Sequence, residues 1–281
     1  MILFPNAKIN LGLRVTSRRP DGYHNLSTVM IPVGWCDILE MMPGEQPGIV
    51  FHSDGDFGAV DAESNLVVKA LRALEAYLGR ALPPLEIYLK KVIPMGAGLG
   101  GGSADASFAI RGANELFGLG LDDEAMAAVA VKVGADCPFF IYNRPALATG
   151  IGEILEPVDI SCVQGYGLLI AKPLSEAVST REAYAGVQVC ALDEGLSPVT
   201  AMSRPIGQWR DDELLNNDFE QSIFPLRPEI ASVKERMYAA GAVFASMSGS
   251  GAAVYGIFPD AKMAEKAMVD FGDCDVFAGS L

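Results

Sequence analysis

Pro94-Met-Gly-Ala-Gly-Leu-Gly-Gly-Gly-Ser-Ala-Asp-Ala106 is a segment with five glycines within seven positions. The alternation of Leu85, Ile87 and Leu89 with polar residues predicts a half-buried strand before it, and residues 103–117 predict a helix after it. Such a segment exposes backbone N–H groups, and the dipole of the following helix adds positive potential at the same place. Phosphate groups are the usual ligands of this arrangement, so the segment indicates nucleotide binding.

Two common nucleotide-binding loops can be compared with this segment. Residues 96–101 satisfy the pattern G-x-G-x-x-G, but that pattern requires an acidic residue at the end of a second strand about twenty residues later. Asp122 and Asp123 lie at that distance and precede a predicted helix with no strand between. This argues against a nicotinamide-dependent oxidoreductase. A Walker A loop is excluded because no lysine follows the glycines.

A second glycine segment, Ser246-Met-Ser-Gly-Ser-Gly251, lies between two predicted strands, residues 242–247 and 252–258. It fits a simple hairpin turn. Together with the first segment, it also fits a second cradle that closes over phosphates. The sequence leaves both interpretations open.

The predicted elements occur in a mixed order that is typical of an α+β protein. Ser64 is a predicted cap for a helix over residues 65–78, which Gly79 ends. Residues 43–61 predict a loop-rich segment with short strand possibilities, and residues 195–209 predict a polar, proline-containing connection. The composition changes near residues 157–165, which indicates a domain boundary. Further strands are expected over residues 7–15, 26–39, 146–155, 166–171 and 275–278, a turn over 18–24, and further helices over 122–134, 137–142, 180–186, 228–240 and 260–271.

The composition excludes several classes of protein. A formal net charge of −14 argues against nucleic acid or an anionic membrane as the main partner, because both attract excess Lys and Arg. The five cysteines are scattered without a C-x-x-C pair and only two histidines are present, so we expect reduced, buried thiols and no zinc site. No signal peptide or membrane-spanning apolar run is recognisable, which favours a cytoplasmic protein.

The glycine segments resemble two motifs of the GHMP kinase superfamily, which includes galactokinase, homoserine kinase and mevalonate kinase. Residues 94–106 look like its phosphate-binding motif, and residues 246–251 look like its third motif. More narrowly, the chain is similar to the 4-diphosphocytidyl-2-C-methyl-D-erythritol kinase family, in order and across nearly its whole length. The segments that carry this likeness are Ala7-Lys-Ile-Asn10, Asp21-Gly-Tyr-His-Asn-Leu26, Gly134-Ala-Asp-Cys-Pro-Phe-Phe140 and Asn217-Asp-Phe-Glu220.

The resemblance implies an α+β, two-domain GHMP kinase fold. It implies an ATP-binding N-terminal domain over residues 1–159, similar to domain 2 of ribosomal protein S5, and a ferredoxin-like C-terminal domain over residues 160–281. The implied reaction is an ATP- and Mg²⁺-dependent transfer of phosphate to the 2-hydroxyl of 4-diphosphocytidyl-2-C-methyl-D-erythritol, in the non-mevalonate pathway to isoprenoid precursors. The implied partner is thus a small molecule, and the oligomeric state stays open.

The resemblance implies catalytic roles for two charged residues. Asp136 would be the base that accepts the hydroxyl proton, and Lys8 would hold its carboxylate ionised or balance charge on the moving phosphoryl group. From the residues alone, Asp136 is equally a carboxylate near the helix that starts at Pro138, and Lys8 is equally a solvated surface lysine. We expect the Lys8 ammonium and the Asp136 carboxylate to point into one cleft near Gly101.

The predicted ATP site has two parts. Ser103 can donate to a phosphate, lie near Mg²⁺ or simply cap the helix. Asn65 and Leu66 are adenine candidates by the resemblance, with Lys90 nearby in sequence, although Asn65 equally fits a helix cap. The remaining predicted ATP-binding residues are Pro94, Gly96, Gly98, Leu99, Gly100, Gly101 and Gly102.

The predicted acceptor site uses aromatic side chains. Tyr23 and Tyr184 could sandwich the cytosine, because every base offers a face for stacking, and His24 could bond the base edge. Asn10 is expected to bond the diol or phosphate region of the substrate. No metal site made of protein ligands alone is predicted.

Two other functions stay open on the sequence. Another GHMP kinase, such as a homoserine kinase, would share the glycine segments but not the Tyr23-His24 turn. A binding module without catalysis would make Lys8 and Asp136 dispensable.

Overall fold

The computed structural model describes residues 1–54, 62–193 and 195–281. These residues form two compact units that are discontinuous in sequence. The first unit comprises Met1–Ala7, Gly34–Ile93 and Gly100–Arg144, and the second comprises Lys8–Val33, Pro94–Leu99 and Pro145–Leu281. The glycine-rich segment therefore contributes residues to both units.

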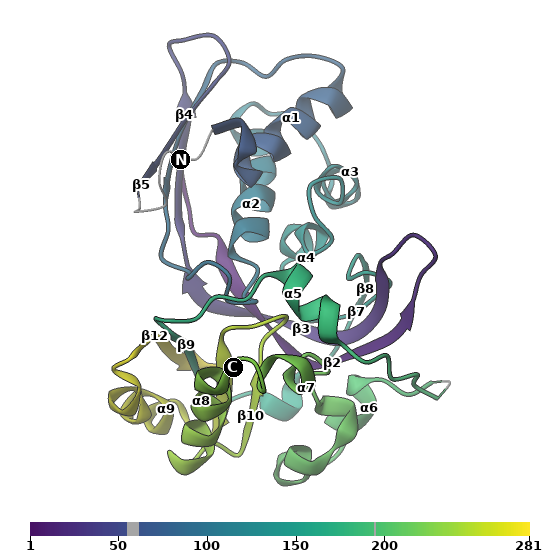
Figure 1. Ribbon diagram of the computed structural model, residues 1–281. Coiled ribbons are helices and arrows are strands. Elements are labelled where there is room, and N and C mark those ends of the chain that lie inside the picture. The colour runs from purple at the N-terminus through teal and green to yellow at the C-terminus, as the bar shows by residue number, and fades with distance from the viewer. Residues whose placement is uncertain (55–61, 194) are drawn as a thin grey trace. The chain divides into compact units, whose positions relative to one another are not determined.

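The first unit is a sheet with helices packed on one face (Figure 1). Its strand order is β1-β4-β6-β5, in which β5 runs parallel to β6 and the other pairs are antiparallel. Leu85, Ile87 and Leu89 of β6 are buried against the helices, which confirms the predicted alternation. The strands are β1 (Ile2–Leu3), β4 (Ile38–Pro43), β5 (Ile49–Asp54) and β6 (Leu85–Lys90), and the helices are α1 (Leu66–Leu78), α2 (Gly101–Leu116), α3 (Asp123–Ala130) and α4 (Cys137–Tyr142).

The ends of these helices show where local prediction holds. Gly79 ends α1 in the left-handed conformation as predicted, but the cap is Asn65 and not Ser64, which lies in a short 3₁₀ helix, Ala62–Ser64. Helix α2 starts at Gly101, two residues before the predicted start, because the glycines themselves adopt the first turn. Helix α3 is capped by Asp122 as predicted and ends at Ala130, before the turn that precedes Gly134.

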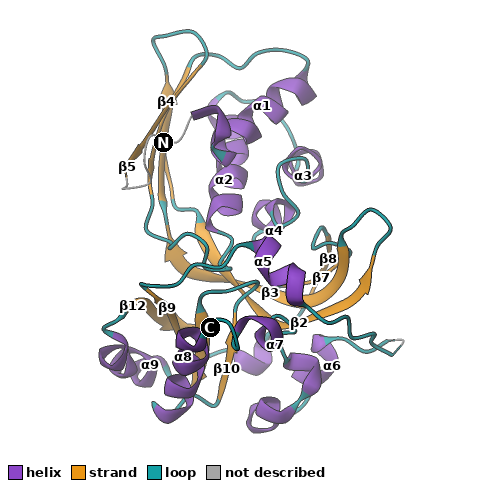
Figure 2. Ribbon diagram, in the orientation of Figure 1, coloured by secondary structure: helices purple, strands orange, loops and turns teal. Residues whose placement is uncertain are grey.

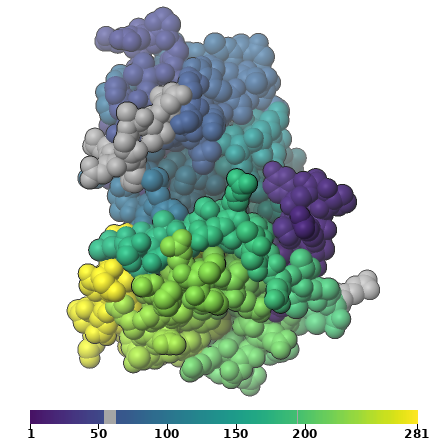
Figure 3. Space-filling model, in the orientation of Figure 1, coloured from purple at the N-terminus to yellow at the C-terminus, as the bar shows by residue number. Residues whose placement is uncertain are grey.

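The second unit begins with a four-stranded sheet of order β2-β3-β7-β8. A turn over residues 19–23 joins the first two strands, and the tip of this hairpin, purple in Figure 3, lies on the surface. Asp37 separates β3 from β4, so the single strand predicted over residues 26–39 is two strands. The strands of this sheet are β2 (Asn6–Arg18), β3 (His24–Cys36), β7 (Ala146–Thr149) and β8 (Ile154–Pro157).

The second sheet of this unit has the antiparallel order β10-β11-β9-β12. Helices α8 (Pro228–Ala239) and α9 (Ala261–Ala267) pack on one of its faces (Figure 2). The chain order from β9 to β12 is the β-α-β-β-α-β pattern of ferredoxin-like domains, so the predicted C-terminal fold is confirmed. The strands are β9 (Gly167–Pro173), β10 (Phe244–Met247), β11 (Val254–Phe258) and β12 (Cys274–Ser280), and a 3₁₀ turn, Met268–Phe271, follows α9.

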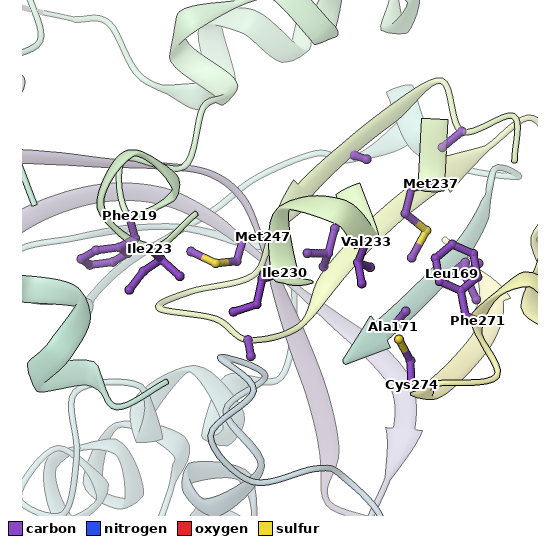
Figure 4. Close-up of a cluster of buried hydrophobic side chains, with 14 of the residues drawn as sticks. Leu169, Ala171, Phe219, Ile223, Ile230, Val233, Met237, Met247, Phe271 and Cys274 are labelled. Atoms are coloured by element: carbon purple, nitrogen blue, oxygen red, sulfur yellow. The ribbon is translucent and has the colours of Figure 1, made fainter. Parts of the chain in front are cut away.

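A continuous apolar core lies between this sheet and its helices (Figure 4). Ile230, Val233 and Met237 recur at helical spacing on α8 and lie in one buried cluster with Leu169 and Ala171 of β9. This burial is the main favourable term that holds the helices on the sheet.

The polar connection predicted over residues 195–209 is wrong in part. It contains helix α6 (Pro198–Met202) and the start of a 3₁₀ helix, Ile206–Asp211, in which Trp209 is fully buried. Such short elements carry no full hydrophobic period, so the pattern of the sequence does not reveal them. Helix α5 (Thr180–Gly186) has the predicted bounds, and α7 (Glu220–Ile223), a 3₁₀ turn at Glu213–Leu215 and another at Ser161–Val163 were not predicted.

Three further findings concern the whole described chain. All five cysteines are free. Cys137 and Cys274 are buried, but Cys162 and Cys190 are exposed, so the predicted burial of the thiols is wrong in part. None of the helices in the described parts is long and apolar enough to cross a bilayer. Residues 55–61 of the predicted loop-rich segment lie outside the described residues.

Candidate active site

The first glycine segment owes its shape to backbone angles that favour glycine. Gly96, Gly98 and Gly100 have φ values of 61°, 73° and 73°, in the left-handed region that L side chains rarely adopt. At Gly98 the space is also closed, because an added Cβ would lie 2.0 Å from the Ser248 carbonyl oxygen. Glycine is therefore required at position 98 for close approach of two backbones.

The carbonyl groups of the segment anchor it within the second unit. Gly96 O accepts from Ala252 N at 3.0 Å, and Gly98 O accepts from Lys8 Nζ at 2.9 Å and from Ser248 Oγ at 3.1 Å. Among the described residues of this unit, the N–H groups of Gly96, Gly98 and Leu99 donate to no backbone carbonyl. The carbonyls thus face the protein, which leaves these amides for other partners. Pro94, half-buried, starts the segment.

The second glycine segment is held by side chains that sequence reasoning did not select individually. Asn217, buried at the start of the segment 217–220, donates from Nδ2 to Met247 O and to Gly249 O, each at 2.8 Å. Glu220 accepts from Met247 N at 2.8 Å. The resemblance had indicated residues 217–220 as a motif, and these bonds give the motif a physical role, because they position the turn that touches Gly98.

Lys8 and Asn10 lie buried on β2 in the second unit. The Lys8 ammonium donates to Asn10 Oδ1 as well as to Gly98 O, so the lysine is not a solvated surface residue. Asn10 Nδ2 donates to Thr28 Oγ1 at 3.1 Å. Because an amide oxygen has two lone pairs and its nitrogen two hydrogens, Asn10 retains one acceptor and one donor position for a substrate.

The aromatic residues predicted for cytosine belong to the same unit. The rings of His24 and Tyr184 stack with centroids 5.0 Å apart, and Tyr184 packs edge-on against Phe219 at 4.8 Å. Tyr23 is 60% exposed at the hairpin tip. Burial and the charge of Arg18 lower the pKa of His24 below its usual value, which keeps the imidazole neutral at pH 7 and able to donate and accept.

The start of α2 in the first unit offers a set of uncapped amides. The N-cap is Gly100, which has no side chain to bond the first-turn N–H groups of Gly101, Gly102 and Ser103. Such amides, with the dipole of a helix of 16 residues behind them, favour an anion. Because Ser103 lies within the first turn, it is not the N-cap.

Asp136 lies close to this helix start, in the same unit. It occupies the N-cap position of α4 and is half-buried, yet its side chain makes no capping bond. The next residue, Cys137, contacts the Ser103 hydroxyl, and Cys137 O accepts from Ser107 Oγ at 2.8 Å. Burial raises the pKa of the Cys137 thiol to about 11, with a further rise from the charge of Asp136, so this thiol stays protonated.

The two adenine candidates also meet the glycine segment in this unit. Asn65 Oδ1 accepts from Val67 N at 2.9 Å, so Asn65 is a helix cap. Leu66 lies against Gly102, where an added Cβ would be 3.1 Å from Leu66 Cδ1. Lys90 is exposed at the end of β6. The first turns of α1 and α2 therefore adjoin one another.

A buried charged cluster in the first unit was not predicted. Lys91 Nζ donates to Asp37 Oδ2 and, at 2.7 Å, to Asp105 Oδ2. Burial raises the pKa of Asp105 to about 7, with Lys91 opposing this rise and Asp37 adding to it. No hydrophobic or motif signal marks such a cluster, because its members are 54 and 14 residues apart in sequence.

Family models match both parts of the chain. The GHMP kinases N terminal domain matches residues 65–144, and the GHMP kinases C terminal domain matches residues 204–272. A 4-diphosphocytidyl-2-C-methyl-D-erythritol kinase of Parabacteroides distasonis is 45% identical over 100% of both chains. The chain belongs to the GHMP kinase family.

Further relatives place this GHMP kinase more narrowly. A protein of Bacteroides fragilis with the same name as the Parabacteroides relative is 47% identical over 94% of each chain. A crystal structure of 4-(cytidine 5'-diphospho)-2C-methyl-D-erythritol kinase superposes with a TM-score of 0.82, at 32% identity and with 100% and 98% of the two chains covered. The predicted resemblance to this family of kinases is thus confirmed.

A more distant structure shows the fold alone. Homoserine kinase from Cytophaga hutchinsonii superposes with a TM-score of 0.72 at 20% identity, over 98% of this chain and 94% of that one. The predicted two-domain α+β GHMP kinase fold is confirmed by these matches together with the family models.

The roles of individual residues stay predictions. The structure brings Lys8, Asn10 and residues 94–99 together in the second unit. It brings Ser103, Asp136 and the start of α2 together in the first unit. The pairing of Lys8 with Asp136 joins residues of the two units and also stays a prediction. Among the described residues, no group of three or more His, Cys, Asp or Glu side chains could hold a metal ion.

Proposed function

We propose that this GHMP kinase transfers the γ-phosphoryl group of ATP to the 2-hydroxyl of 4-diphosphocytidyl-2-C-methyl-D-erythritol. The observation that carries the proposal is the uncapped start of α2, close to the half-buried Asp136 at the start of α4. The names of the relatives and of the structure with a TM-score of 0.82 support the choice of acceptor.

Phosphoryl transfer requires positioning of the reactants and neutralisation of charge on the phosphoryl oxygens. In the proposal, the amides of residues 96–103 bind the phosphates, with Asn65 and Leu66 at the adenine. The hydroxyl of Ser103 is proposed to donate to a phosphate, and Mg²⁺ would neutralise phosphate charge when bound. Pro94 starts the loop.

Asp136 is the proposed base. A tertiary alcohol is a weak acid, so Asp136 accepts the proton while the new P–O bond forms, rather than in an earlier step. Lys8 is proposed to keep this carboxylate ionised and to balance charge on the transferred group. The buried position of Lys8 and its bond to Gly98 O support this role, because they fix the ammonium at the phosphate loop.

The acceptor is proposed to bind through its cytosine and its diol. Tyr184 and His24 are already stacked on one another, so the base is expected to bind against this pair, with Tyr23 closing from the exposed hairpin. Asn10 is proposed to use its remaining donor and acceptor for the methylerythritol part.

The domain limits are part of the proposal. We assign residues 1–159 to the ATP-binding domain and residues 160–281 to the C-terminal domain, with the reaction in the cytoplasm.

The first experiment offers three acceptors in parallel. The protein is incubated with ATP, Mg²⁺ and 4-diphosphocytidyl-2-C-methyl-D-erythritol, homoserine or mevalonate, and products are measured by mass. One added phosphate on the first acceptor alone is the expected result. Phosphorylation of homoserine instead would assign the chain to the other branch of the family.

The second experiment tests the base. Asp136→Asn should lower kcat by roughly 10²–10⁴-fold, because the amide cannot accept the proton. The affinity for ATP, measured by calorimetry, should stay within about twofold, since the substitution preserves shape. An Asp136→Asn variant with full turnover would remove Asp136 from the mechanism.

A further inference from the structure

The buried cluster of Asp37, Lys91 and Asp105 connects the two ends of the glycine-rich segment. Lys91 lies just before the segment, and Asp105 lies near its end, after the glycines and in the second turn of α2. Asp37, between β3 and β4, bonds both the lysine and the backbone that follows it: it accepts from Lys91 Nζ, and its Oδ1 accepts from Val92 N at 2.5 Å and Ile93 N at 2.8 Å.

Packing brings the same two ends into contact. A Cβ added at Gly101 would lie 3.1 Å from Ile93 Cγ2 and 3.3 Å from Lys91 Nζ. The lysine ammonium is therefore directly behind the first residue of α2. The side chains of Lys91 and Asp37 are 9% and 0% exposed, so water screens their charges little.

One hydrogen-bond acceptor atom of the cluster has no donor among the described residues. Asp105 Oδ1 is buried and has no hydrogen-bond partner among the described residues, while Asp105 Oδ2 accepts from Lys91. Two carboxylates and one ammonium in a buried place leave an excess negative charge, which is costly. A proton on Asp105 removes this excess negative charge. The burial of Asp105 and the nearby charge of Asp37 both favour binding of this proton.

We propose that Asp37, Lys91 and Asp105 form a clamp that positions the start of α2 for the phosphates of ATP, and that a proton on Asp105 keeps the clamp electrically neutral. Loss of that proton places a negative charge one turn behind the phosphate-binding amides. ATP binding then weakens, because like charges repel across a region of low dielectric. The inference rests on the proposed function, since it assigns the ATP phosphates to the start of α2.

The pKa of Asp105, raised to about 7, sets the pH range of this effect. The charged groups that face Asp105 are Lys91 and Asp37. Below pH 7 the clamp carries no net charge, and above pH 7 it carries one negative charge. The affinity for ATP should therefore fall as pH rises through this value.

The test is a calorimetric measurement of the Kd for MgATP at pH 6, 7 and 8.5. Asp105→Asn keeps the shape and an acceptor for Lys91 but cannot ionise. Glu115→Gln, an exposed carboxylate on the same helix, is the matched control. The titration of ATP itself is common to all three proteins, so it cancels in the comparison.

Between pH 6 and 8.5, the Kd for MgATP of wild type and of Glu115→Gln should rise by roughly two- to tenfold more than the Kd of Asp105→Asn. Asp105→Ala should weaken binding at every pH, because the clamp loses its contact with α2, and kcat should change less than the KM for ATP. Thermal unfolding at each pH shows that every variant is folded.

Three outcomes overturn the inference. Equal pH profiles for wild type and Asp105→Asn remove the role of the proton. Wild-type affinity in Asp105→Ala removes the clamp, and both results leave the proposed kinase activity intact. Absence of any MgATP binding by wild type overturns the inference and the proposed function together.

Discussion

The two glycine segments look alike in sequence but use glycine for different reasons. In residues 94–103, the carbonyls of Gly96, Ala97 and Gly98 accept hydrogen bonds and the start of α2 has no side-chain cap. In residues 246–251, the side chains of Asn217 and Glu220 hold the turn through hydrogen bonds with its backbone. The first segment is the proposed phosphate-binding loop, and the second segment supports it through the contact of Ser248 with Gly98.

The largest expected effect tests the contact between the segments. Gly98→Ala should lower the free energy of unfolding by about 3–5 kcal/mol, because its Cβ collides with the Ser248 carbonyl and its φ is positive. Urea denaturation measures the change. Gly165→Ala is the control, since its φ is also positive, at 86°, but nothing lies within 4 Å of the added Cβ. Similar losses in both variants would mean that only backbone strain matters.

The next effect tests the support of the second segment. Asn217→Ala should cost about 1–3 kcal/mol of stability, because two buried carbonyls lose their donor. Asn216→Ala, at the exposed neighbouring position, should change stability by less than about 0.5 kcal/mol. If Asn217→Ala unfolds at the wild-type urea concentration, the turn does not depend on this side chain.

The stability of the protein is expected to depend on pH through Asp105, which follows the glycines of the first segment. The folded-state pKa of Asp105 lies near 7, above the usual value of 3.8, so the folded protein binds more protons than the unfolded chain between these values. The contribution of Asp105 to the free energy of unfolding should thus decrease as pH rises from about 4 to about 7 and stay level above that. Urea denaturation of Asp105→Asn should show a smaller decrease. The same slope in both proteins would contradict the raised pKa.

The smallest effect separates ligand binding from stability. Ser103→Ala should change the free energy of unfolding by less than about 1 kcal/mol, because its hydroxyl contacts a weakly bonding thiol. The KM for ATP should rise by roughly two- to tenfold, the value of one hydrogen bond to a phosphate. A variant with lost stability and unchanged KM would place Ser103 with the support rather than with the ligand.

Local signals in the sequence predicted most elements of the fold. Gly79 and Asp122 mark helix ends, and the alternation of Leu85, Ile87 and Leu89 marks a strand, because these patterns depend on residues close in sequence. The short helices after residue 195 were missed, and the cap of α1 was expected at Ser64, with Asn65 only as an alternative. A few residues carry too weak a period, and two adjacent cap formers, Ser64 and Asn65, compete for one position.

The sequence by itself determined a glycine-rich segment between a strand and a helix, for which it predicts phosphate binding, and its motifs identified the family. Only the tertiary structure decided what surrounds that segment: Lys8 against Gly98, Asn217 behind the second turn, and Lys91 between Asp37 and Asp105. The reason is physical. Glycine angles and helix caps are local properties, whereas burial of a charge depends on residues that are far apart along the chain and meet only in the folded protein.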